Sequence, residues 1–355
     1  MNQFLSGVGV IFSLEMRQRL RGVAWYVLLG VFFGILFLIT VVTSIVVFGA
    51  GDTNANRHVG GPLYSLVIYF VLLLGVLVAP AMSGNAINGD RDAGTLATTQ
   101  VTLITTWQLV LGKFLAAWVT ALGFLAVSLP FLIYGAVVGG PNIVTITVSL
   151  LVLILELGVV AAIGVGLSGL INRPLFSVVV TYLAVAALTL GTLIAFVLGG
   201  FAVQSKTVTY YYDNIHQKSQ TCTGLETYRE SVPRFDLDWG LLVPNPFVVI
   251  SDAIPTTYDT NGNPDDLFGQ FKLVERGAQQ SPFRNSSPAA ACRDDLSYTS
   301  DSSTGAKPST LISTTAPSWA IGLGIQLVLA VAALCGAWAR TRTPARRLSK
   351  GSRIA

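Results

Sequence analysis

Charged residues are scarce in this sequence. Of its 355 residues, 11% are Asp, Glu, Lys or Arg, whereas 52% are hydrophobic, and the mean hydropathy is +0.64. Soluble domains carry about 25% charged residues. The composition excludes an ordinary soluble protein, because too much apolar surface would face water, and it predicts an integral membrane protein.

Cysteine and histidine are rare as well. Three cysteines are too few for a disulfide-rich scaffold or a cysteine metal site, and His58 and His216 lie too far apart in the sequence to suggest a metal centre. A phosphate-binding loop is missing, since Gly112-Lys113 is followed by Phe114 rather than by Ser or Thr. We also find no Ser/His/Asp set and no HExxH motif. The sequence therefore predicts no metal, no cofactor and no catalytic residue in this chain.

Long apolar runs are abundant. A helix needs about 20 mostly apolar residues to cross the hydrocarbon core of a bilayer, and none of these runs shows the alternation of a barrel strand. The first run has 26 uncharged residues, too long for a signal-peptide core of roughly 7–15 residues. The sequence thus predicts an all-α polytopic membrane protein with six transmembrane helices. They are expected at about 23–48, 62–86, 114–138, 143–171, 174–203 and 317–340.

Basic residues are distributed unevenly over the two sides of these spans. Twelve Lys and Arg residues flank the spans on the side that holds both termini, whereas the short loops on the other side contain only Arg57. Short cytoplasmic loops carry an excess of Lys and Arg, so we expect both termini to be cytoplasmic in a multi-pass protein of the inner or plasma membrane. Because topology explains the basic residues, the net charge of +4 does not indicate nucleic-acid binding.

The polar segments define the remaining organisation. Residues 1–22 have amphipathic character and predict a helix in the cytoplasmic interface; an extension of the first span is the alternative. Spans one to five occupy 23–203 and enclose a polar loop at 87–113. An extracellular domain is expected at 204–316, with a basic cytoplasmic tail at 341–355. Residues 241–254 within the extracellular domain are apolar enough to lie on the membrane surface.

Two cysteines fall in the predicted extracellular domain. Disulfides persist in oxidising compartments, so we expect Cys222 and Cys292 to be bonded; the alternative is two free thiols. Cys335 lies in the last span and is not expected to reach them.

Glu156 is the only charged residue in the interior of a predicted span, since Arg340 stands at the very end of the last one. A charge at the bilayer centre costs about 2.5–3.5 kcal/mol on insertion scales, so its side chain should face protein or water rather than lipid. It either takes part in a transport pathway or makes a structural hydrogen bond. Small residues also repeat every four positions in spans two, four and five. Such stripes allow close helix packing, either within one subunit or at a moving subunit interface.

The loop at 87–113 is the most informative segment. It contains the only charges between Arg57 and Glu156. Three of them, at 90–92, come just before Gly-Thr-Leu, and the fourth, Lys113, belongs to a Gly-Lys pair that begins 16 residues after this Leu. A solvated loop with ordinary flanking charges would also fit the composition. The order of the residues, DRDAGTL at 90–96 followed by Gly112-Lys113, resembles the first cytoplasmic loop of type-2 ABC exporter permeases. That family commonly has Glu-Arg-x-x-Gly-Thr-Leu, with Glu where this chain has Asp90.

The resemblance implies a function for the chain. It would be the permease half of an exporter, paired with a second permease subunit, identical or related. Separately encoded ABC ATPase subunits would bind ATP and Mg and dock on the loop. The residues that would form this ATPase-coupling contact are Asp90, Arg91, Asp92, Gly94, Thr95, Leu96 and Lys113. The predicted extracellular domain is larger than the family typically has.

Two other functions stay open. A secondary transporter would work without ATP but should contain several intramembrane ionisable groups and broken helices in matched halves. A membrane-anchored enzyme or sensor would need a catalytic constellation in 204–316, which we cannot assemble. An apolar pathway with one Glu would suit a lipophilic or amphipathic solute.

Overall fold

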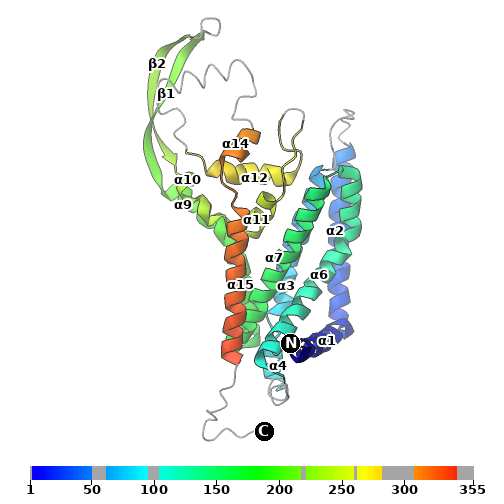
Figure 1. Cartoon of the computed structure of the whole chain (residues 1–355). Coiled ribbons are helices and arrows are strands. Elements are labelled where there is room, and N and C mark those ends of the chain that lie inside the picture. The colour runs from blue at the N-terminus through cyan, green and yellow to red at the C-terminus, as the bar shows by residue number, and fades with distance from the viewer. Residues whose placement is uncertain are drawn as a thin grey trace.

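The computed structural model describes residues 2–49, 61–94, 104–216, 221–259, 262–281 and 308–341. Within them, six helices are long and apolar enough to cross a membrane, and they lie side by side in an elongated bundle (Figure 1). The prediction of an all-α polytopic protein is confirmed to the extent that six helices have the length and composition of membrane spans. The spanning helices are α2 (Val23–Gly49), α3 (Gly61–Ser83), α6 (Thr106–Gly139), α7 (Ile143–Leu170), the continuous run α8–η1–α9 (Pro174–Ala186, Ala187–Gly191 and Thr192–Ala202), and α15 (Trp319–Thr341).

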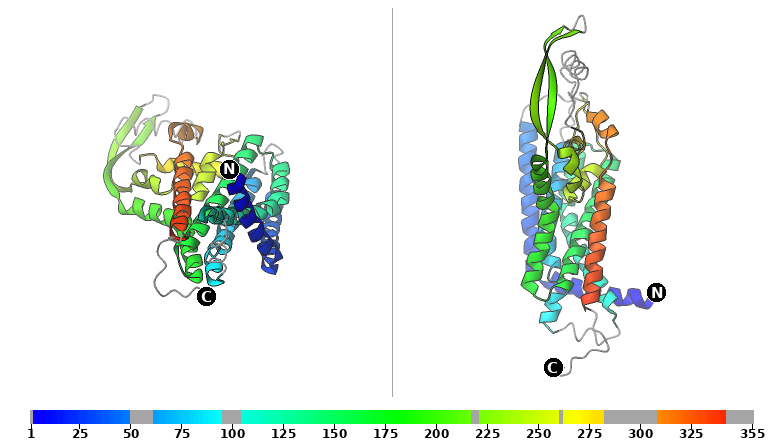
Figure 2. Two further views of the ribbon diagram at one scale, coloured as in Figure 1. Left: turned by 60° about the horizontal axis from the view of Figure 1, so that its bottom comes forward. Right: turned by 90° about the vertical axis from the view of Figure 1, so that its left-hand side faces the viewer.

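Two further helices, one long and one short, lie at one end of the bundle. Helix α1 (Asn2–Arg21) crosses the bundle axis and turns at Gly22 into α2, and α4 (Asn88–Asp92) follows α3 after a tight turn (Figures 1 and 2). Helix α15 finishes at the same end, which we call the terminal end. The structure thus contains the predicted N-terminal helix as an element separate from the first span.

The start of α6 differs from the prediction. The sequence suggested a polar loop up to 113 and a span from 114, but α6 begins at Thr106 and continues through Gly112 without a break. A capping box explains the start, because Thr105 and Gln108 bond each other's backbone N–H groups. Residues 95–103 lie outside the described residues.

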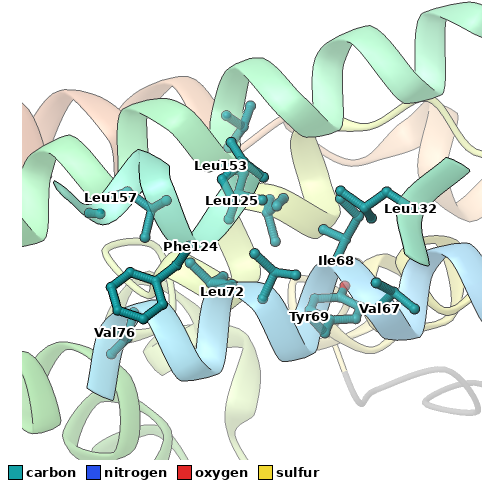
Figure 3. Packing of buried hydrophobic residues seen from close by; sticks show 14 of the residues in the cluster. Val67, Ile68, Tyr69, Leu72, Val76, Phe124, Leu125, Leu132, Leu153 and Leu157 are labelled. Carbon is teal, nitrogen blue, oxygen red and sulfur yellow. The ribbon is translucent and has the colours of Figure 1, made fainter. Parts of the chain in front are cut away.

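The core of the bundle is formed by α3, α6 and α7. Leu72 of α3, Phe124 of α6 and Leu153 of α7 are almost fully buried and pack together (Figure 3). Leu157 of α7 extends this cluster and fills the space beside Gly75 of α3. These helices therefore form a compact centre, whereas α2 and α8–η1–α9 expose most of their apolar side chains.

Helices α7 and α15 pack with very close backbones. A methyl group on Gly166 would overlap the side chain and backbone of Ala333, and one on Gly169 would overlap Ala337. Gly158 contacts the Trp118 ring. The small-residue stripe of the fourth span therefore packs against other helices of this chain.

The segment between spans five and six begins with a long β-hairpin that the sequence analysis did not predict. Strands β1 (Gln204–His216) and β2 (Thr221–Pro233) are antiparallel, with Gln204 opposite Pro233 and His216 opposite Thr221. The hairpin projects well beyond the helices, as Figures 1 and 2 show. We call this side of the molecule the hairpin end.

The rest of that segment packs on the bundle. It contains α10 (Phe235–Asp238), η2 (Trp239–Leu241), α11 (Pro246–Ala253), α12 (Leu267–Ala278) and α14 (Pro308–Thr314). Val249, Ile250 and Ile254 are fully buried in the same cluster as the bundle core. Packing within the protein accounts for the apolar character of 241–254, because α11 contacts α7, α12 and α15. A position on the membrane surface stays a prediction.

An ion cluster fixes this segment to the start of α15. Arg276 of α12 binds Asp252 of α11 at 2.6 Å, and Asp252 also accepts hydrogen bonds from the backbone N–H groups of Ser318 and Trp319. A carboxylate at a helix N-terminus is stabilised by the helix dipole. Glu275 is buried beside this pair, and burial raises its pKa to about 7.

The predicted Cys222–Cys292 disulfide is not supported by the structure. Cys222 lies in β2, Cys292 lies outside the described residues, and the cysteine whose thiol is described, Cys335, is free. The disulfide stays a prediction.

Candidate functional site: the polar cluster at the terminal end

The candidate site is built around Lys113. This lysine of α6 is 1% exposed, and its Nζ atom binds the carboxylates of Glu15 on α1 and Asp90 on α4, the latter at 2.7 Å. A buried ammonium group is stable only when it is paired and hydrogen-bonded. One side chain thus joins three elements that are distant in the sequence.

Glycines allow α1 to come this close to α6. A side chain at Gly112 would overlap Ile11, and one at Gly7 would overlap Gln108. The Gln108 amide donates to the carbonyl oxygen of Phe4 at 3.2 Å. The Gly112-Lys113 pair therefore has a structural explanation: the glycine permits the crossing and the lysine fixes it electrostatically.

Arg19 completes the α1 side of the cluster. Its Nε atom lies 3.8 Å from the Glu15 carboxylate, and its guanidinium approaches the Thr120 hydroxyl at 3.4 Å. Burial lowers the pKa of Arg19, and the Glu15 charge opposes that shift. Glu15 is therefore shared by two cations. Nothing local in the sequence marks Glu15 as part of a site, although it is the only acidic residue in the first 51 positions.

Arg91 ties α4 to the loop between α7 and α8. Its guanidinium donates to the side-chain oxygens of Asn88 at 2.9 Å and Asn172 at 3.1 Å. The Asn88 amide donates to the carbonyl oxygen of Ile171, and the Ser168 hydroxyl accepts hydrogen bonds from the N–H groups that begin α4. These contacts, missed in the sequence, mean that α4 cannot move without the ends of α7 and α8.

The predicted coupling residues thus separate into two groups. Asp90, Arg91 and Lys113 hold the subunit together, whereas Asp92 and Gly94 are exposed at the tip that follows. Gly94 has a φ of 70°, a left-handed conformation that favours glycine. Thr95 and Leu96 lie outside the described residues. The sequence placed all these residues at one contact, and among those that the structure describes the 92–94 tip is the exposed part.

Glu156 lies far from this cluster, in the middle of α7. Its side chain is fully buried, and neither carboxylate oxygen has a hydrogen-bond partner among the described residues. Gln326 of α15, also fully buried, is the side chain that interacts with it. The expectation that Glu156 faces protein rather than lipid is met.

Two cavities near the hairpin end are lined by described residues other than Glu156. A hollow of about 290 Å³ lies between α3, the α6–α7 loop and the start of α12, with Tyr64, Thr145 and Asp266 in its wall. A shallower groove of about 660 Å³ lies between α9, α10 and α12 and is lined mainly by apolar groups such as Phe196, Phe235 and Val274. A pathway role for Glu156 therefore stays a prediction.

Comparison with known proteins gives no family assignment. No protein-family model matches the sequence, and no curated protein matches it.

Proposed function

We propose that this chain is the membrane-spanning permease subunit of a type-2 ABC exporter. It would catalyse no reaction itself and would work with separate ATPase subunits that bind ATP and Mg, and with a second permease subunit in the lipid bilayer. The termini would be cytoplasmic and the hairpin end extracellular. The transported solute would be lipophilic or amphipathic, in keeping with the apolar spans.

One observation supports this proposal above the others. The exposed 92–94 tip belongs to a short helix that is clamped to α6 by Lys113, to the α7–α8 loop by Arg91, and to α1 through Glu15. A force applied at the tip would reach these elements together, because packed interfaces switch between discrete arrangements rather than deform continuously. An ATPase-coupling element requires this mechanical connection.

Purification of the tagged chain from its native membrane tests the proposal. We expect an ATPase that contains a phosphate-binding loop to copurify, and its ATP turnover to depend on the permease. Replacing Asp92 by Arg should weaken the association without unfolding the chain, since Asp92 is exposed. Arg17→Glu, a charge reversal at an exposed position of α1, is the matched control. Absence of any copurifying ATPase would refute the proposal.

A secondary transporter is the second candidate, and buried Glu156 is the observation that favours it. Buried acidic residues in membranes often belong to proton relays. Solute transport by the purified chain alone in vesicles, driven by a pH gradient and unaffected by ATP, would establish this alternative.

A further inference from the structure

Buried oxygen atoms of two interacting side chains lack a hydrogen-bond donor where α7 faces α15. They are Oε1 and Oε2 of Glu156 and Oε1 of Gln326, and none has a partner in the part of the chain that the structure describes. Both residues are 0% exposed. Buried polar groups are normally hydrogen-bonded, so three unsatisfied acceptors at one place need an explanation.

The orientation of the Gln326 amide is fixed by its other contact. Its Nε2 atom donates to the carbonyl oxygen of Pro244 at 3.1 Å, and a carbonyl oxygen can only accept. The amide nitrogen is therefore engaged with the loop before α11, and Oε1 is left as an acceptor. Oε1 cannot satisfy an ionised Glu156, because a carboxylate is also only an acceptor, so the second N–H of the amide is the single donor that Gln326 can offer to the two carboxylate oxygens.

A second set of hydrogen bonds starts at Asn245, the residue that follows Pro244. Asn245 caps α11 by accepting from the Phe247 N–H, and its Nδ2 atom donates to the Thr189 carbonyl at 2.8 Å and to the Thr192 hydroxyl at 2.9 Å. Thr189 lies in η1 (Ala187–Gly191), a single π-helical turn within span five. Pro244 and Asn245 thus stand between α15 and span five.

No charged group balances Glu156 from the helices packed against it. These helices are α3, α6, α8, α11 and α15. The charged residues that they contain are engaged elsewhere or lie at their ends: Lys113 with Glu15 and Asp90, Asp252 with Arg276, and Arg340 at the terminal end of α15. The tyrosines Tyr64 and Tyr182 bond Ser149 and the Leu77 carbonyl, respectively; Tyr69 of α3 packs among phenylalanine rings.

We propose that Glu156 is a proton-binding site. The carboxyl group is a neutral acid whose O–H donates to Oε1 of Gln326, and this bond begins a chain that runs through Gln326 to Pro244 and, through adjoining Asn245, to the π turn of span five. With one proton the Glu156 carboxyl becomes a hydrogen-bond donor, and Oε1 of Gln326 gains the donor that it lacks. A metal ion fits less well, because hard cations take about six or more oxygen ligands and this site offers three.

The proton adds a hydrogen-bonded link between parts of the molecule that already pack against one another. When Glu156 loses it, the Glu156–Gln326 bond is lost, and α15 and the 244–245 segment keep their packing against α7 but lose this hydrogen-bonded link to its centre. Protonation would therefore hold the hairpin-end segment, α15 and span five in one arrangement. This inference does not depend on the presence of an ATPase.

Infrared spectroscopy of the full-length chain in lipid vesicles tests the proton directly. The measurement uses the Glu275→Gln background at about neutral pH, because Glu275 has a pKa of about 7 and would add a protonated carboxyl of its own. We expect a carbonyl band of a protonated carboxylic acid that shifts on ¹³C labelling of glutamate and disappears in Glu156→Gln. Gln326→Met should shift the band, because it removes the acceptor.

Each result decides a part of the proposal. Absence of a protonated glutamate band would show that Glu156 is ionised and would overturn the site, and the ¹³C label gives this answer even if a variant does not fold. A band that is unchanged by Gln326→Met would overturn the link to Gln326. Thermal unfolding provides an independent test. Glu156→Met should lower Tm, because Oε1 of Gln326 would lose its hydrogen-bond donor, whereas removal of an ionised Glu156 would raise Tm.

Discussion

Gly166 of α7 lies directly against Ala333 of α15, with no room for a side chain between the two backbones. Replacing Gly166 by Ala should force the helices apart and destabilise the protein by about 1–3 kcal/mol, the usual range for overpacking. The expected result is a lower Tm of the purified protein in detergent.

Gly324→Ala is the matched control for this substitution. Gly324 also lies in α15, but nothing lies within 4 Å of the position that a Cβ atom would occupy. Because Ala has the higher helix propensity, this variant should leave Tm unchanged or raise it slightly. Equal destabilisation by the two substitutions would mean that α7 and α15 do not pack as described.

Replacing Lys113 by Met should destabilise the terminal end strongly. The substitution leaves Glu15 and Asp90 without their shared cation, and breaking a buried ion pair costs about 3–5 kcal/mol. The measurement is the unfolding free energy, supported by protease accessibility of α1.

The double variant Glu15→Gln, Lys113→Met separates pairing from packing. It should recover part of the loss, because the remaining buried charge at position 15 is removed. Arg17→Met, at an exposed position of the same helix, should change little. Additive effects of the two substitutions would argue against a direct ion pair.

Glu275 should make stability depend on pH in a defined window. Its pKa is about 7 in the folded protein against an ordinary value of 4.5, so the unfolded state releases the proton first as the pH rises. Its contribution is therefore lost between about pH 4.5 and 7, by up to roughly 3 kcal/mol.

Comparison with Glu275→Gln isolates this effect. The difference in unfolding free energy between the wild-type chain and the variant should change steadily across the window and level off on both sides. Other titrating groups cancel in the difference. A difference that does not vary with pH would show that Glu275 is not buried as described.

The Cys222–Cys292 disulfide can be checked by peptide mapping of unreduced, alkylated protein. Such a bond would close a loop of about 70 residues, worth about 4 kcal/mol in the chain-entropy model. We expect a linked peptide pair that disappears on reduction. Fully alkylated Cys222 and Cys292 would argue against both the bond and an extracellular position of the hairpin.

Long uncharged runs made the spans predictable, because in a bilayer the backbone must satisfy its own hydrogen bonds and a helix does so locally. The hairpin was missed although β1 is rich in Thr, Tyr and Val, residues favoured in strands. Its position among many polar residues hid this signal. Helix α6 was shortened in the prediction because Gly112-Lys113 looked like a boundary, whereas both residues are packed inside the helix crossing.

The terminal-end cluster shows what the sequence could not give. Asp90, Arg91 and Lys113 were selected from their order along the chain, but Glu15 lies 98 residues from Lys113 and Asn172 lies 81 from Arg91. Such pairs arise from how the helices pack, which local patterns do not specify. The same holds for Gln326, whose contact with Glu156 depends on the α7–α15 register.

The bond from Asn245 to Thr189 also sets an order of assembly. Thr189 enters the bilayer early, as part of span five, but the side chain that binds its carbonyl is synthesised 56 residues later. Between them the chain must form a hairpin beyond the bundle and return. Span five is therefore completed only after the following segment has folded back onto it, and a stalled or truncated chain that ends near residue 240 would leave this helix unfinished in the membrane, open to quality-control proteases.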